Sequence, residues 1–133
     1  MTDGKIAFCF PGQGSLESGM GRDIAEALPE AREVFEIGSE ASGLDLEKLC
    51  FDTELEDMVE TDLQQPALVA TSLAIDAALR ARGIAPDYVV GHSVGEFSAL
   101  GEGCCGHLCS SLAPGWTVRR GGSLRHPHFV RIV

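Results

Sequence analysis

The chain has 133 residues, of which 44% are hydrophobic, and its formal net charge is -10. This length suits one domain with a modest core, and the hydrophobic content argues against a disordered chain. The acidic balance argues against nucleic acid as a partner, and the sequence contains no stretch of about 18 apolar residues that would predict a membrane span.

The first elements can be predicted from apolar spacing and from the positions of proline and glycine. Residues 5–10 form a short apolar run that ends at Pro11 and Gly12, which predicts a buried strand leading into a loop. Residues 21–42 have helical spacing, and Pro29 is expected to divide them into two helices. Gly43 predicts the end of the second helix. Residues 44–63 are expected to form short helical turns.

A stronger helix is predicted to begin at Gln65 and Pro66, because proline suits the first turn of a helix, and to end near Ala81. Its side chains are apolar on most faces, which predicts that it is central and largely buried. Residues 88–90 predict a second buried strand, followed by a turn and a helix that begins near Phe97. Two apolar strands with helices between them predict an α/β fold with a parallel sheet and flanking helices.

The turn after the second strand has the sequence Gly91-His92-Ser93-Val94-Gly95. A Gly-x-Ser-x-Gly pattern between a strand and a helix is typical of a nucleophile elbow, in which a strained backbone exposes the serine oxygen. Side chains two residues before and after the serine would collide with the turn, which explains glycine at both places. The Val94 N–H would lie at the helix start, where it can stabilise an oxyanion. The alternative is an ordinary glycine-rich turn with a capping serine.

The loop after the first strand places glycine on both sides of Gln13. A dinucleotide-binding fingerprint would need a third glycine at position 17, which is occupied by Glu17, and a phosphate-binding loop would need a lysine that is absent here. The flanking glycines would let the backbone and side-chain amide of Gln13 approach a ligand closely. The alternative is a plain turn.

Three motifs occur in order: Phe10-Pro11-Gly12-Gln13-Gly14-Ser15, Gln64-Gln65-Pro66-Ala67 and Gly91-His92-Ser93-Val94-Gly95-Glu96. Together they closely resemble malonyl-CoA:acyl-carrier-protein transacylases and the related acyltransferase domains of polyketide synthases. The resemblance extends from about residue 5 to residue 100. It implies an incomplete form of the α/β-hydrolase-like large subdomain of these enzymes.

The resemblance implies transfer of a malonyl group from coenzyme A to the phosphopantetheine thiol of acyl carrier protein, through a Ser93 acyl-enzyme, in fatty acid synthesis. No cofactor is implied. Gln13 and the Val94 N–H match the oxyanion donors of the family, and Gln65 matches a glutamine that lines its active site, although Gln65 could instead cap a helix. His92 is expected to support the nucleophile.

The final segment departs from the family pattern. Residues 1–100 contain 19 of the 20 acidic residues, whereas residues 101–133 contain one acid and four arginines and show no helical or strand period. We therefore expect residues 1–100 to form the amino-terminal part of an acyltransferase domain and residues 101–133 to be an aberrant tail, translated out of frame or disordered.

In the family an arginine binds the malonyl carboxylate; Arg119 and Arg120 are weak candidates for it. In the family a histidine also serves as the base. We do not assign that role to any of the three histidines in this segment, which are His107, His126 and His128.

The cysteines favour neither a disulfide framework nor a metal site. Their number is five, and the cluster at Cys104, Cys105 and Cys109 lacks the second ligand pair that structural zinc requires. The residues after Met1 do not have the pattern of a secretory signal, so a cytoplasmic location is expected.

Two other functions compete with acyl transfer to a carrier protein. An α/β-hydrolase-type esterase or thioesterase would share the Gly-x-Ser-x-Gly elbow, although the loop around Gln13 favours the transferase. The second competing function is that of a non-catalytic fragment that acts by associating with another molecule. It is considered because the expected base and the carboxylate-binding arginine are not recognisable in the sequence.

Overall fold

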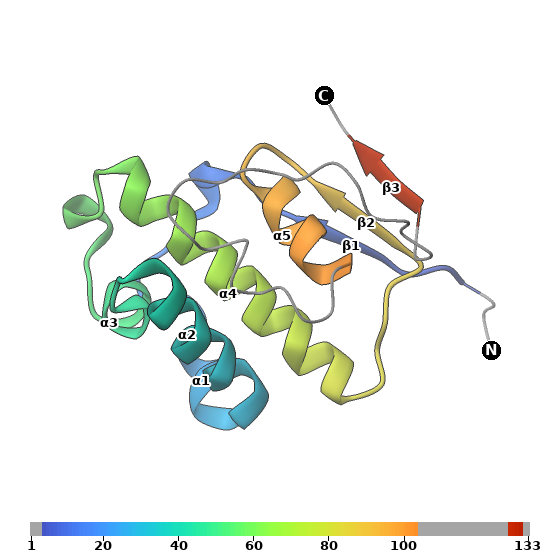
Figure 1. The fold of residues 1–133 in the computed structure, drawn as a ribbon, viewed down its shortest axis with the longest axis horizontal. Coiled ribbons are helices and arrows are strands. Elements are labelled where there is room, and N and C mark those ends of the chain that lie inside the picture. The colour runs from blue at the N-terminus through green and yellow to red at the C-terminus, as the bar shows by residue number, and fades with distance from the viewer. Residues whose placement is uncertain (1–3, 104–127, 132–133) are drawn as a thin grey trace.

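The structure is a computed structural model that describes residues 4–103 and 128–131. Figure 1 shows their arrangement in space, with a small sheet lying against a long helix. The helices and strands follow one another in this order: β1 (Ala7–Phe10), the 3-10 helix η1 (Gln13–Ser15), α1 (Arg22–Ala27), α2 (Pro29–Ser42), α3 (Leu46–Phe51), the 3-10 helix η2 (Leu55–Asp57), α4 (Thr61–Ala81), β2 (Tyr88–Gly91), α5 (Gly95–Gly103) and β3 (His128–Arg131).

The strands form a parallel sheet in the order β1-β2-β3. Ala7 pairs with Tyr88 and Phe10 with Gly91, so β1 and β2 end at the same level. The predicted parallel sheet is confirmed, as is the α/β class, and the two predicted strands are neighbours in it. Parallel strands with matched ends bring the loops that follow them to one edge of the sheet.

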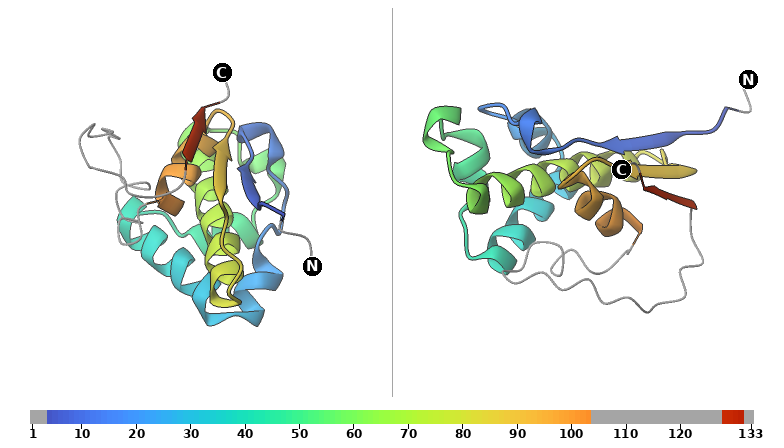
Figure 2. Two further views of the ribbon diagram at one scale, coloured as in Figure 1. Left: turned by 90° about the vertical axis from the view of Figure 1, so that its right-hand side faces the viewer. Right: turned by 90° about the horizontal axis from the view of Figure 1, so that it is seen from above.

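One face of the sheet is covered by helices α4 and α5 (Figure 2). Phe10 and Val89 are buried on that face together with Ala99 of α5, and Phe8 packs against them. Ala7 and Cys9 point to the other face and are exposed. The prediction that residues 5–10 form a buried strand is therefore confirmed in part. Ala7–Phe10 form a strand, but within the described residues helices cover only the face that carries Phe8 and Phe10.

The division of residues 21–42 at Pro29 is confirmed. Helix α1 ends at Ala27, Leu28 takes an extended conformation, and Pro29 is the first residue of α2, where its missing N–H costs no hydrogen bond. Helix α2 ends at Gly43, whose φ of 74° is a left-handed conformation that glycine adopts without steric cost. The predicted end of this helix is also confirmed.

Helix α4 begins earlier than the sequence predicts. Its first residue is Thr61, so Pro66 lies inside the helix rather than in its first turn. The missing N–H of Pro66 leaves the carbonyl of Asp62 without its helical donor. Asp62 is exposed on the first turn, where water can satisfy that carbonyl. Residues 67–74 are buried without interruption, which confirms that this helix is central.

Helix α5 and strand β3 also differ from expectation. The helix after the elbow was predicted to begin near Phe97, but α5 begins at Gly95 and continues to Gly103. Strand β3 lies in a segment with no visible strand period and pairs with β2 along its whole length. Residues 104–127 lie outside the described residues, and most of the expected aberrant tail lies there, so that expectation stays a prediction.

Phe35 is the largest fully buried side chain of the described core. Its ring packs edge-on against Phe51 with centroids 5.0 Å apart, which joins α2 to α3. We expect Phe35→Ala to lower the free energy of unfolding by about 3–5 kcal/mol, because the cavity left behind cannot fully collapse. Urea unfolding followed by far-UV circular dichroism measures this change.

The neighbouring Glu36 provides the control, because it is exposed on the same helix. Glu36→Ala should change the free energy of unfolding by less than about 0.5 kcal/mol. Equal effects of the two substitutions would contradict the packing described here.

Candidate active site

Ser93 occupies a strained turn between β2 and α5. Its φ is 53°, and among the described residues it is the one non-glycine residue with a positive φ. Serine rarely adopts this conformation, and such strain persists when the surrounding structure enforces it. Ser93 is exposed, although Gly91 and Val94 beside it are buried. The turn therefore has the backbone geometry of a nucleophile elbow.

The two glycines of the turn are required by close backbone contacts. A Cβ at Gly91 would lie 2.3 Å from the carbonyl oxygen of Gly95, and a Cβ at Gly95 would lie 2.2 Å from the carbonyl oxygen of Phe10. Both distances are far below van der Waals contact, and both involve backbone that cannot move aside. The steric reason inferred from the sequence for the two glycines therefore agrees with the geometry.

His92 joins the elbow to the loop that follows β1. Its N–H donates to the carbonyl of Phe10 at 3.1 Å, which extends the pairing of the two strands by one residue. A Cβ at Gly12 would lie 2.7 Å from Nδ1 of His92, so the imidazole ring lies directly over the Gly12 backbone. The sequence predicted a supporting role for His92, and this contact holds the two loops together.

The side chain of Gln13 is held between two glutamines at the start of α4. Its Nε2 donates to Oε1 of Gln64 at 2.7 Å, and its Oε1 accepts from Nε2 of Gln65 at 3.3 Å. Both ends of the amide are therefore engaged. An amide nitrogen can donate twice and an amide oxygen can accept twice, so each polar atom keeps capacity for a second partner, and the expectation that this amide could approach a ligand stays a prediction. The backbone N–H of Gln13 opens η1, where a first residue has no partner within the helix.

Gln64 is a member of this network to which the sequence gave no role. It accepts from Gln13 and donates to the carbonyl of Met58, so it ties Gln13 to the segment before α4. Gln65, predicted to line the site or to cap a helix, lies in the second turn of α4 and contacts Gln13 instead of capping. The signal available in the sequence was the pair of adjacent glutamines before Pro66.

The Val94 N–H lies at the amino-terminal end of α5. The helix begins at Gly95, and the N–H groups of Gly95, Glu96 and Phe97 are bonded to carbonyls of the turn at 2.9–3.1 Å. Within the described part of the chain, Val94 N–H donates to no backbone carbonyl. The positive end of the α5 dipole lies here too, so negative charge that develops on an oxygen near Ser93 would be stabilised.

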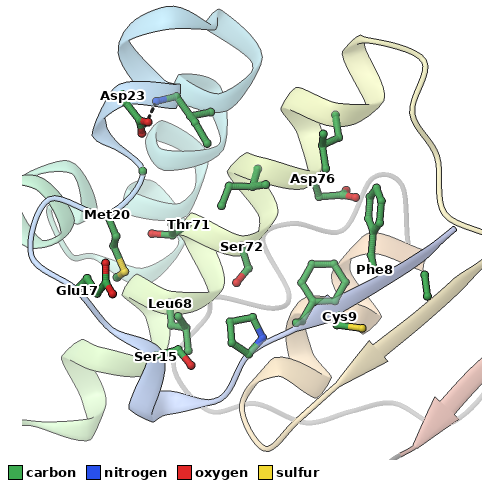
Figure 3. A pocket seen from close by; sticks show the side chains of 17 residues that line it. Phe8, Cys9, Ser15, Glu17, Met20, Asp23, Leu68, Thr71, Ser72 and Asp76 are labelled. Carbon is green, nitrogen blue, oxygen red and sulfur yellow. Dashed lines mark hydrogen bonds between the residues drawn. The ribbon is translucent and has the colours of Figure 1, made fainter.

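A cavity of about 490 Å³ lies away from Ser93, between β1, α1 and α4 (Figure 3). None of the five predicted site residues lines it. Asp76 of α4 lines this cavity and is 7% exposed, and Figure 3 shows its carboxylate beside Phe8. Burial raises the pKa of the Asp76 carboxyl, and Arg80, whose Nε donates to it at 3.2 Å, opposes that rise only in part.

The comparisons with known proteins agree with this geometry. The family model described as "Acyl transferase domain" matches residues 7–126. The chain belongs to the acyltransferase family. The malonyl CoA-acyl carrier protein transacylase of Bacillus subtilis is 44% identical over 96 residues, which are 72% of this chain and 30% of that protein.

Solved structures of acyltransferases share the fold. The malonyl CoA-acyl carrier protein transacylase of Clostridium perfringens is 36% identical, with a TM-score of 0.76 over 82% of this chain and 34% of that one. A malonyl-transacylase in complex with its type II polyketide synthase acyl-carrier protein is 40% identical, with a TM-score of 0.70 over 75% of this chain and 33% of that one. The chain therefore spans about a third of the length of these relatives.

Several residues weighed from the sequence lie outside the described residues. These are the candidate arginines Arg119 and Arg120, the histidines His107 and His126, and the cysteine cluster at Cys104, Cys105 and Cys109. Within the described ranges, no group of three or more His, Cys, Asp or Glu side chains could hold a metal ion. No helix in those ranges is long and apolar enough to cross a membrane.

We expect Gly95→Ala to destabilise the chain by at least about 1–3 kcal/mol, because its Cβ would overlap the Phe10 carbonyl. Gly14→Ala is the matched control, since a Cβ at Gly14 meets nothing within 4 Å. Urea unfolding of both variants measures the difference. If the two substitutions have the same effect, β1 and α5 do not approach as closely as described.

The raised pKa of Asp76 predicts how the stability of the folded chain depends on pH. A carboxyl with a higher pKa in the folded chain than in the unfolded chain binds its proton more tightly when folded, so the folded chain gains stability as pH falls through that pKa. Asp76→Asn removes this titration. The variant should be more stable than the wild type at pH 7, and the difference should shrink toward acidic pH.

Thermal unfolding at a series of pH values measures this difference. Superimposable far-UV spectra of the two proteins are the control for an unchanged fold. A difference in stability that stays constant from pH 7 into the acidic range would contradict a raised pKa for Asp76.

Proposed function

We propose that this chain carries the nucleophile of an acyl-carrier-protein S-malonyltransferase, with Ser93 as the residue that accepts the malonyl group. The observation that carries the proposal is the strained backbone of Ser93, with a φ of 53° at a strand-to-helix turn. An ordinary turn with a capping serine needs neither this strain nor the two backbone contacts that exclude a side chain at Gly91 and Gly95. The family of the chain supports the same reading.

Two backbone N–H groups are proposed as the oxyanion donors. The Val94 N–H lies at the start of α5, and the Gln13 N–H lies in the loop that packs against His92. The contacts of Gln13 with Gln64 and Gln65 fix the loop that carries its N–H, so the side chain acts by positioning. Loss of one such donor typically removes about 3–4 kcal/mol of transition-state stabilisation.

The proposed reaction has two transfers of the malonyl group. The Ser93 oxygen attacks the thioester carbonyl of malonyl-CoA, the C–S bond breaks, and coenzyme A leaves as its thiol with the proton that serine gave up. The phosphopantetheine thiol of acyl carrier protein then attacks the seryl ester, the C–O bond breaks, and Ser93 regains a proton. No oxidant, reductant or cofactor is needed.

The relatives support the two partners. One named relative transfers malonyl from coenzyme A to acyl carrier protein, and one solved structure holds a malonyl-transacylase together with its carrier protein. We place the reaction of this chain in fatty acid synthesis, as the sequence predicted. The cytoplasmic location stays a prediction.

The chain as given should perform this reaction slowly. Among the residues whose side chains are described, His92 is the one histidine, and its ring lies over Gly12. Serine is a weak nucleophile unless a base accepts its proton. We therefore expect slow acylation of Ser93, supported by the oxyanion donors alone.

Incubation of the purified chain with malonyl-CoA tests this prediction. Intact mass should show slow addition of one malonyl group that is absent from Ser93→Ala. Addition of holo acyl carrier protein should then discharge the ester faster than water does, which separates a transferase from an esterase or thioesterase. Rapid, stoichiometric acylation would show that a base lies outside the described residues. Complete absence of acylation would favour the non-catalytic fragment.

A further inference from the structure

The loop that carries the Gln13 N–H is attached to the rest of the structure on both sides of Gln13. Before it, the imidazole ring of His92 lies over the Gly12 backbone, where a Cβ would be 2.7 Å from Nδ1. After it, Leu16 is buried in the main core. Between these attachments Gly14 is exposed, and a Cβ there would meet nothing within 4 Å. The exact place of the Gln13 N–H therefore depends on what the Gln13 side chain contacts.

The amide of Gln64 has one orientation, which two backbone carbonyls decide. Its Nε2 donates to the carbonyl of Met58 and, at 3.4 Å, to the carbonyl of Val59. An amide nitrogen only donates and an amide oxygen only accepts, so Oε1 of Gln64 faces the other way. Nε2 of Gln13 donates to that oxygen at 2.7 Å, and this leaves Oε1 of Gln13 to accept from Gln65. The two carbonyls thus set the direction of every hydrogen bond in the glutamine network.

The carbonyl that anchors this network belongs to the core. Met58 is 0% exposed and packs in the same cluster as Phe35, and its N–H donates to the carbonyl of Leu55 at 3.2 Å. The backbone of Gln64 is fixed as well, because its N–H donates to the carbonyl of Glu60 at 3.0 Å at the start of α4. Close-packed core residues hold their positions, so Gln64 presents its oxygen to the loop at a fixed place.

The position of a backbone donor matters for catalysis. An oxyanion donor acts when its N–H lies within hydrogen-bond distance of the oxygen that becomes charged, and it must already be there before the charge develops. A displacement of about 1 Å in such a group can cost about 100-fold in rate. A loop that is open to solvent at Gly14 needs an attachment to keep this precision.

We propose that Gln64 is a positioning residue for the Gln13 N–H. It touches no substrate, and it acts through the Gln13 side chain by holding that side chain against the fixed carbonyl of Met58. The proposal rests on the proposed function, because the Gln13 N–H is assigned there as an oxyanion donor. The alternative is a link that adds stability between α4 and η1 and has no effect on the donor.

Two substitutions of Gln64 separate these accounts. Gln64→Met keeps the length of the side chain but removes all of its hydrogen bonds. Gln64→Glu keeps an acceptor for Gln13 but cannot donate to the carbonyl of Met58, because a carboxylate only accepts. Asp62→Asn is the matched control, since Asp62 is exposed near the start of the same helix.

Nuclear magnetic resonance of the full ¹⁵N-labelled chain measures the positioning directly. In the wild type, the order parameter of the Gln13 backbone N–H should be about 0.85, the value of a rigid backbone. It should fall below about 0.6 in Gln64→Met and in Gln64→Glu, and Asp62→Asn should leave it unchanged. This measurement needs no substrate, so it does not depend on whether Ser93 reacts.

The rate of Ser93 acylation at several concentrations of malonyl-CoA measures the consequence. Gln64→Met should lower the maximal rate at least about tenfold and change the half-saturating concentration by less than about twofold, because the lost interaction acts in the transition state. Gln13→Met should have the same effect. The double variant should be no slower than Gln13→Met alone, because both substitutions remove one contact. Superimposable far-UV spectra confirm that each variant is folded.

Two results would overturn the proposal. The first is an order parameter of the Gln13 N–H that Gln64→Met leaves at the wild-type value. The second is a double variant whose loss of rate is the product of the two single losses, which would mean that Gln64 acts independently of Gln13. A wild-type chain that malonyl-CoA does not acylate at all would instead contradict the proposed function, and the order parameter would still decide whether Gln64 positions Gln13.

Discussion

The close approach of α5 to the end of β1 is the constraint on which the site depends. The backbone at Gly95 lies so near the carbonyl of Phe10 that a Cβ there would be 2.2 Å from its oxygen. This contact requires that β1 and β2 end at the same level and that the chain turn sharply between β2 and α5. Ser93 lies in that turn and takes a left-handed conformation because the short connection leaves no other path. The strain at Ser93 is thus a consequence of how tightly the sheet and helix pack.

Helix α4 provides the support for this arrangement. Its buried middle joins the main core with Phe35 and Leu46, while its first turns hold Gln13 through Gln64 and Gln65. One rigid element therefore stabilises the core and also fixes the loop opposite Ser93. Polar groups held by a packed helix keep their positions without reorganisation, which is what stabilisation of a developing charge requires.

The same fold leaves β1 covered on one side only among the described residues. Phe10 and Val89 are buried beneath α5, but Ala7 and Cys9 are exposed, and Asp76 keeps one carboxylate oxygen without a partner beside Phe8. The exposed side chains of Ala7 and Cys9 lie on the sheet face that the described helices do not cover, whereas Asp76 belongs to α4 on the covered face. The chemistry of the elbow and the open side of β1 are therefore separate properties of one small sheet, and each can change without the other.

The sequence by itself determined the features that depend on neighbouring residues. Strands β1 and β2, the break at Pro29, the end of α2 at Gly43 and the steric need for glycine on both sides of Ser93 were predictable, because proline, glycine and apolar spacing act on the local backbone. The tertiary structure decided the rest. The start of α4 at Thr61, the contact of Gln64 with Gln13, the exposure of Cys9 and the pairing of β3 all depend on segments far apart in the chain. Propensity and periodicity are properties of a short window, whereas these features are set by which distant surface the window meets.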